Sequence, residues 1–272
     1  ITTPTSQNRM IGYPYTKRMV ANPDVDMASG IILCSVERAR ALGVPADRWV
    51  FVHAGTDAKD RSLSERLNFH SSAAMRIAGT RALELAQVDI DQVEHVDLYS
   101  CYPSAVQLAL RELSISADRQ LTVYGGLSFA GGPWNNPVGH ALCSMVQVLR
   151  KDAGSMGLVT ANGGHVDKHA FGLYSTNPPT AGYRWERPQA EVDAVAGRPA
   201  AGDYLGEAAI ETWTVMHDRE GLATRGHAAC LTPQGERAWA VTSQPELMAA
   251  MTSEALLGRA VQIAAEGELQ FL

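Results

Sequence analysis

The chain has 272 residues, of which 46% are hydrophobic and 19% charged, and its net charge is −6 at pH 7. These values are typical of a globular protein with a sizeable core, and they exclude a broad electrostatic attraction to nucleic acid or anionic membranes. The four cysteines are scattered without a C-x-x-C pair, which predicts reduced thiols in a cytoplasmic protein. No apolar stretch approaches the roughly 18 residues that a membrane-spanning helix needs.

Apolar runs and helical periodicities alternate along the first two thirds of the chain. Helical spacing, with Ser35 as a cap and Gly43 as a stop for the first helix, predicts helices at residues 36–42, 71–86, 104–112 and 137–151. Short apolar runs predict buried strands at residues 31–34, 49–53, 93–98, 157–161 and 170–174. This alternation indicates an α/β fold in which helices cover a layered sheet.

The last third of the chain has a different composition. Residues 177–204 are rich in Pro, Ala, Gly and Glu, which predicts a linker. Beyond it, alternating runs predict a small β-rich domain with one short helix, and the runs lie at residues 209–216, 228–231, 237–241 and 261–264. The predicted organisation is therefore a domain at 1–176, a linker at 177–204 and a second domain at 205–272.

The order of the motifs resembles the C-terminal half of the thiolase superfamily. Tyr99-Ser100-Cys101-Tyr102 follows a strand, and Gly125-Gly126-Leu127, Gly131-Gly132-Pro133 and Asn162-Gly163-Gly164 come after it. The chain is most similar to the actinobacterial (mycobacterial) thiolase-like proteins with an additional C-terminal domain, which are related to the sterol-carrier-type thiolases. The resemblance implies a thiolase-like C-terminal half, a mixed sheet covered by helices, followed by a small β-rich, OB-like domain.

Three departures from the family pattern concern catalysis. Sterol-carrier-type thiolases carry His-Asp-Cys-Phe at residues 99–102 and Gly-His-Pro at residues 131–133, and many thiolases carry a second catalytic cysteine at Asn162. The nucleophilic cysteine of a thiolase lies in the N-terminal half, which this sequence lacks. Claisen chemistry needs a thiolate, a base and an oxyanion hole. The sequence therefore predicts degenerate motifs with weak or no thiolase activity.

Three side chains are candidate catalytic groups. Cys101 is either an acid–base group, as the surviving motif cysteine, or a small buried residue at a strand end. His165 is either a replacement base, because its loop lines the pocket in the family, or a residue that stabilises that loop. His140, eight residues past Gly132, is either a base or a core histidine. His169 is expected to face solvent, and no metal site is expected, because the preceding glycines disfavour the helix that a His165–His169 ligand pair needs.

The motif glycines form a second candidate site, for CoA or an acyl-CoA bound as a ligand rather than as a tightly held cofactor. Their backbone N–H groups can approach a thioester oxygen or the pantetheine chain closely. The alternative is that the fold needs these glycines for its tight turns, whether or not a ligand binds. The candidate binding residues are Gly125, Gly126, Gly131, Gly132, Asn162 and Gly163.

Two functions stay open at this point. The first is a thiolase-like, acetyl-CoA acetyltransferase-related protein that binds CoA or acyl-CoA, and the second is a non-catalytic scaffold or partner-docking protein of lipid or sterol metabolism. Residues 205–272 contain four Arg, no Lys and nine acidic residues, so nucleic-acid binding by the OB-like domain is not expected. The start at Ile1 indicates a fragment, and the expected partner is an N-terminal thiolase half, from the same gene product or another chain. A lone half exposes an apolar face, so a homo- or hetero-oligomer is also expected.

Overall fold

The computed structural model describes all residues, 1–272, and the chain forms two compact units. The first contains Ile1–Val20, Arg61–Phe69 and Ala196–Leu272, and the second contains Ala21–Asp60 and His70–Val195. The boundaries of these units differ from the predicted division into 1–176, 177–204 and 205–272. The first 20 residues and the nine-residue segment Arg61–Phe69 belong to the same unit as the C-terminal residues. No helix is long and apolar enough to cross a membrane.

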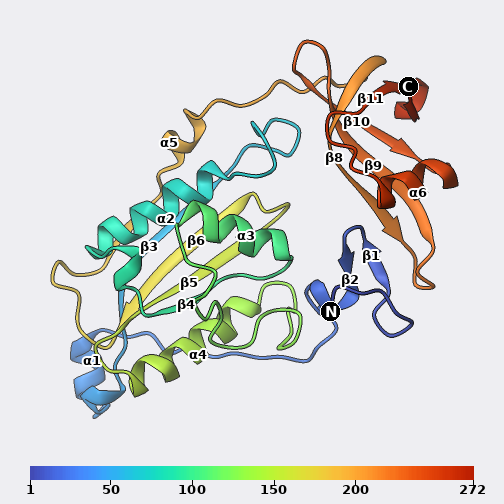
Figure 1. Cartoon of the computed structure of the whole chain (residues 1–272). Helices are drawn as coiled ribbons and strands as arrows, with labels where there is room; N and C mark the ends of the chain where they lie inside the picture. Colours follow the sequence, from blue (N-terminus) through green and yellow to red (C-terminus); the bar gives the residue numbers. More distant parts are fainter. The chain divides into compact units, whose positions relative to one another are not determined.

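A five-stranded mixed sheet forms the centre of the second unit, in the order β4-β5-β6-β3-β7 (Figure 1). The pairs β4–β5 and β3–β7 are parallel, and the pairs β5–β6 and β6–β3 are antiparallel. The prediction of a mixed α/β sheet is confirmed. In chain order the strands are β3 (Phe51–Lys59), β4 (His95–Asp97), β5 (Met156–Gly163), β6 (Lys168–Ser175) and β7 (Arg184–Glu186).

Helices cover both faces of this sheet. Leu158 and Leu173 pack with α2 (Ala73–Ala86) and α3 (Pro103–Glu112) in one buried cluster. Their sequence neighbours Val159 and Tyr174 pack on the other face with α4 (Pro137–Lys151). This division follows from the period of two along a strand, which turns adjacent side chains to opposite faces. The unit also holds α1 (Val36–Ala41) and α5 (Gln189–Asp193), and α5 and β7 lie inside the range predicted as a linker.

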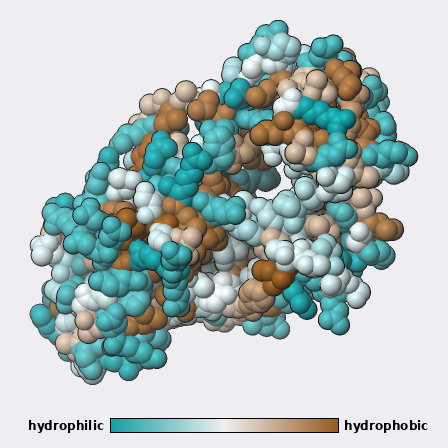
Figure 2. Space-filling view, viewed as in Figure 1, coloured by the Kyte–Doolittle hydropathy of each residue, from teal (hydrophilic) through white to brown (hydrophobic).

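The strand predicted at residues 31–34 is wrong. The segment has no strand pairing, and the side chain of Ile32 is 93% exposed. Its apolar composition suits a buried strand. A strand also needs a neighbouring strand, which accepts hydrogen bonds from its N–H groups and donates to its carbonyl oxygens. No described strand in this unit pairs with it. On the face in Figure 2, hydrophobic residues lie in separate patches among hydrophilic ones.

The first unit is built around a small barrel. In the main sheet β8 (Gly206–His217) pairs with β9 (Ala223–Leu231) and β11 (Ala260–Ile263), β9 pairs with β10 (Arg237–Thr242), and β11 pairs with β12 (Leu269–Phe271). A bridge between Val241 and Glu268 closes the ring of five strands. Helix α6 (Pro245–Ser253) places Met248 and Met251 in the barrel core. The short strands β1 (Met10–Gly12) and β2 (Tyr15–Thr16) extend the sheet beyond β8.

Arg237 holds residues 61–69 against this barrel. Its side chain is 0% exposed and forms a bidentate pair with Glu211, at 2.7 and 2.8 Å. Its Nη1 donates to the carbonyl oxygens of Leu63 and Arg66, and its guanidinium lies 4.3 Å from the ring centroid of Phe69. Every nitrogen of the guanidinium therefore has a partner, as a buried charge requires.

Candidate functional site

Cys101 lies in the loop between β4 and α3, just beyond the carboxyl end of β4. The parallel neighbour β5 ends close by, so the amide Nδ2 of Asn162 reaches the Sγ of Cys101 at 3.5 Å. Two of the predicted site residues, far apart in the sequence, are thus brought together. Burial raises the pKa of the Cys101 thiol. No cationic side chain contacts it, so the group that would produce a reactive thiolate is absent.

The phenol of Tyr99 lies in the same loop. Burial raises its pKa, and its hydroxyl donates to the carbonyl oxygen of Trp134 at 3.4 Å. Its backbone N–H donates to the hydroxyl of Thr160 at 2.9 Å, which ties the loop to β5. Tyr99, Cys101 and Asn162 therefore bring together three neutral polar groups, namely a phenol, a thiol and an amide.

His165 lies in the turn between β5 and β6 and is exposed. Its backbone N–H donates to Asp167 Oδ1 at 2.7 Å, and its ring makes no hydrogen bond or ion pair. Gly164, with φ +62, makes the preceding bend. The structure shows no contact between His165 and Cys101, and Gly163 belongs to the end of β5, where it pairs with Lys168.

His140 lies in the first turns of α4 and has a buried Nε2 atom without a hydrogen-bond partner. No hydrogen bond joins this ring to Cys101 or Asn162. Neither histidine predicted as a catalytic base is therefore joined to the Cys101–Asn162 pair. No group of three or more His, Cys, Asp or Glu residues is arranged to hold a metal ion.

The glycine loop packs against residues 21–27 of the same unit. Gly125, Gly126 and Gly131 have φ values of +109, +77 and +99, which side chains rarely adopt. A Cβ on Gly131 would lie 2.5 Å from the Sδ of Met27. The N–H of Gly132 donates to the carbonyl oxygen of Asn22 at 2.8 Å.

The N–H of Gly125 donates to Thr122 Oγ1. At least two of the candidate N–H groups are therefore used within the loop and its neighbours, whereas Gly126 and Gly131 donate no hydrogen bond there.

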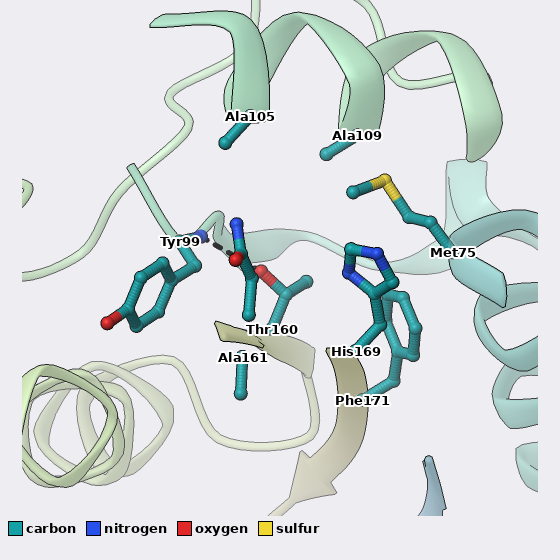
Figure 3. A pocket seen from close by; sticks show the side chains of 9 residues that line it. Met75, Tyr99, Ala105, Ala109, Thr160, Ala161, His169 and Phe171 are labelled. Carbon is teal, nitrogen blue, oxygen red and sulfur yellow. Dashed lines mark hydrogen bonds between the residues drawn. The ribbon is translucent and has the colours of Figure 1, made fainter. Parts of the chain in front are cut away.

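His169 is buried, with 3% exposure, so the expectation that it faces solvent is wrong. It lines a small cavity with residues of β5, α2 and α3, among them Thr160, Asn162 and Met75 (Figure 3). The sequence carried a signal for this. His169, Phe171 and Leu173 recur at the period of two that marks one face of a strand, but the strand was expected to begin only at residue 170, whereas β6 begins at Lys168.

Comparison with known proteins agrees with this architecture. Residues 188–268 match the family model of the thiolase-like protein type 1 additional C-terminal domain. A search of curated proteins found no match.

The whole chain is similar to the crystal structure of a monomeric SCP2-thiolase-like protein type 1 from Mycobacterium smegmatis, with a TM-score of 0.86 and 31% sequence identity. The similarity covers 99% of this chain and 60% of that one, so the chain spans less than two thirds of the length of that relative. The thiolase-like fold and the small β-rich, OB-like domain predicted from the sequence are confirmed. The chain is therefore similar to the thiolase-like proteins, and its residues 188–268 match the additional C-terminal domain of their type 1.

Proposed function

We propose that the second unit binds CoA or an acyl-CoA as a ligand, and that the protein has weak or no thiolase activity. The observation that supports this is the Cys101–Asn162 pair, at 3.5 Å between Sγ and Nδ2, with the phenol of Tyr99 in the same loop. A thioester carbonyl is uncharged and accepts hydrogen bonds, so it suits neutral donors. Carboxylates or phosphates would instead select cationic side chains.

The absence of a base beside Cys101 argues against turnover. The burial-raised pKa keeps the thiol protonated at neutral pH, and a protonated thiol does not hold an acyl group covalently. The rings of His165 and His140 form no hydrogen bond with it. Proton abstraction from the α-carbon of a thioester needs a base within hydrogen-bond reach.

We further propose that an N-terminal thiolase half completes the protein. The solved relative has residues beyond the 60% that this chain covers, and it is described as monomeric. That description favours a half on the same polypeptide over a second copy. The exposed apolar side chains of Ile32 and Leu33 provide an apolar segment for that half to cover.

Calorimetry with CoA and acetyl-CoA on the full chain tests the binding proposal. Binding is expected, together with no release of free thiol and no acetoacetyl-CoA from acetyl-CoA. Asn162→Leu removes one amide donor and is expected to weaken acetyl-CoA binding by about tenfold, the equivalent of roughly 1.4 kcal/mol. Asn135→Leu, at an exposed asparagine of the glycine loop, is the matched control and is expected to bind as the unaltered chain does. No heat of binding at millimolar ligand would overturn the proposal.

The second candidate function is a non-catalytic scaffold. It is favoured by the glycine loop, in which the N–H groups of Gly125 and Gly132 donate to protein oxygens and leave fewer donors for a ligand. The same calorimetry separates the two functions, because a scaffold of this kind binds neither CoA nor acetyl-CoA. A stoichiometric protein complex that leaves the Cys101 thiol unprotected would support it.

A further inference from the structure

His169 is part of a buried polar network that none of the motifs described above includes. Its Nε2 lies 3.2 Å from the hydroxyl of Ser72 and 3.7 Å from Asp60 Oδ2. The Ser72 hydroxyl lies 2.5 Å from the same carboxylate oxygen. All three side chains are buried, and they come from the start of α2, the residue after β3 and strand β6.

The proton positions follow from counting donors. Ser72 has one hydroxyl proton, and its short contact with Asp60 directs that proton to the carboxylate. Its oxygen also caps α2 by accepting the N–H of Met75 at 3.0 Å. Toward His169, Ser72 is therefore an acceptor. The Nε2 atom must carry a proton in order to donate to it, which leaves Nδ1 of the neutral ring as an unprotonated acceptor.

This Nδ1 atom faces a cavity. No protein group bonds to it, and Figure 3 shows the ring beside Met75 and Phe171 with this nitrogen turned toward Thr160. The hydroxyl of Thr160 accepts the N–H of Tyr99, so its own proton is free to be donated. The side chain of Asn162 lines the same cavity. One ring nitrogen, one hydroxyl-bearing side chain and one amide therefore line the same cavity.

The space matches one small molecule. The cavity has room for about one water molecule, and a buried water needs two to four polar partners. Anions are disfavoured, because the carboxylates of Asp60 and Glu112 both contact Ser72 just behind the ring.

We propose that His169 is a proton-accepting binding residue for a small neutral hydrogen-bond donor, which is a water molecule in the free protein. Ser72 and Asp60 are positioning residues that fix the ring in the tautomer protonated at Nε2. Asn162 belongs both to this site and to the Cys101–Asn162 pair, so the two sites are adjacent. It does not depend on CoA binding, so its test is independent of the function proposed above.

Nitrogen-15 NMR of histidine-labelled full chain is the test. The expected spectrum shows a pyrrole-type Nε2 and a pyridine-type Nδ1 for His169, and water cross-relaxation to the neighbouring Thr160 methyl group. His169→Gln assigns the signals. The exposed ring of His165 is the internal reference and is expected to show mixed tautomers.

Ser72→Ala is expected to shift the His169 tautomer ratio, and Thr160→Val is expected to abolish the water signal while Thr160→Ser retains it. An Nδ1-protonated or doubly protonated His169 at neutral pH would overturn the assignment. Absence of water contacts in the folded, unaltered chain would do the same. The tautomer is measured from nitrogen chemical shifts of the folded protein, so a destabilised variant that still folds gives a result. If a variant does not fold, the spectrum of the unaltered chain tests the assignment by itself.

Discussion

The two units both bury charged or polar side chains, but they do so in different ways. In the first unit, the guanidinium of Arg237 has a partner at every nitrogen, and it joins the barrel to residues 61–69. In the second unit, Cys101, Asn162 and His169 each retain hydrogen-bonding capacity that no protein group uses. Burial alone therefore does not mark a functional site. A buried polar group with an unused donor or acceptor facing a cavity is the more informative sign.

The largest expected effect on stability is at Arg237, whose guanidinium nitrogens all have hydrogen-bond partners. Arg237→Met removes the partner of the Glu211 carboxylate and leaves buried carbonyl oxygens without donors, so we expect the first unit to lose about 3–5 kcal/mol of unfolding free energy. Arg225→Met, on the exposed part of β9, is the control and should change the free energy by about 0.5 kcal/mol or less. Urea unfolding followed by fluorescence measures both. Equal midpoints for the two variants would contradict a structural role for Arg237.

The next effect concerns the glycine loop. Gly131→Ala places a side chain at φ +99 and 2.5 Å from the Sδ of Met27, so we expect a loss of about 1–3 kcal/mol from strain and overpacking. Gly30→Ala, which meets nothing within 4 Å and has no positive φ, should be nearly neutral in the same unfolding assay. A neutral Gly131→Ala would show that the loop is not held in this conformation.

A smaller loss is expected at Ser72. Ser72→Ala removes a helix cap and one partner of the Asp60 carboxylate, and we expect about 1–2 kcal/mol of destabilisation. Ser35, which caps α1 by accepting the N–H of Arg38 at 3.2 Å in an exposed position, supplies the matched variant. Ser35→Ala should cost about 0.5 kcal/mol, as read from the shift in urea midpoint. A Ser35 effect as large as that of Ser72 would mean that the buried network adds nothing to capping.

The smallest expected effect is that of pH, acting through the thiol of Cys101. Its burial-raised pKa predicts less thiolate than in the unfolded chain at the same pH, so alkylation by iodoacetamide should be slower in the folded protein and accelerate as the pH rises above about 8.5. The folded state retains the Cys101 proton to higher pH than the unfolded state does. The free energy of unfolding therefore falls as the pH rises from the pKa of the unfolded state through the higher pKa of the folded state. Mass spectrometry distinguishes Cys101 from the exposed Cys34. Rapid alkylation of Cys101 at pH 6 would indicate an activated thiolate instead.

Local patterns in the sequence predicted much of the second unit. The helix expected at residues 71–86 is found at Ala73–Ala86, and the one expected at residues 137–151 is found at Pro137–Lys151. These elements have the apolar spacing and the caps or prolines that set their ends. Residues 31–34 have an apolar run of the same kind but form no strand, because strand formation depends on a partner and not on composition alone.

Long-range packing could not be predicted in the same way. Nothing in the local composition of residues 61–69 indicates that their carbonyl oxygens accept hydrogen bonds from Arg237, which lies more than 160 positions further along the chain. His169 was missed for a different reason, because the strand that contains it was expected to begin one residue later, at residue 170. Cys101 and Asn162 were both chosen from motifs, but their contact depends on β4 and β5 being parallel neighbours.

Chemical-shift mapping of CoA binding on the full chain, by two-dimensional amide NMR, tests the central comparison most directly. We expect amide chemical-shift changes that saturate with CoA at residues 99–102 and 160–165 and at Gly126 and Gly131. The signals of the barrel strands β8 to β11 are expected to stay unchanged. Saturable shifts confined to the barrel, or no shifts at millimolar CoA, would contradict it.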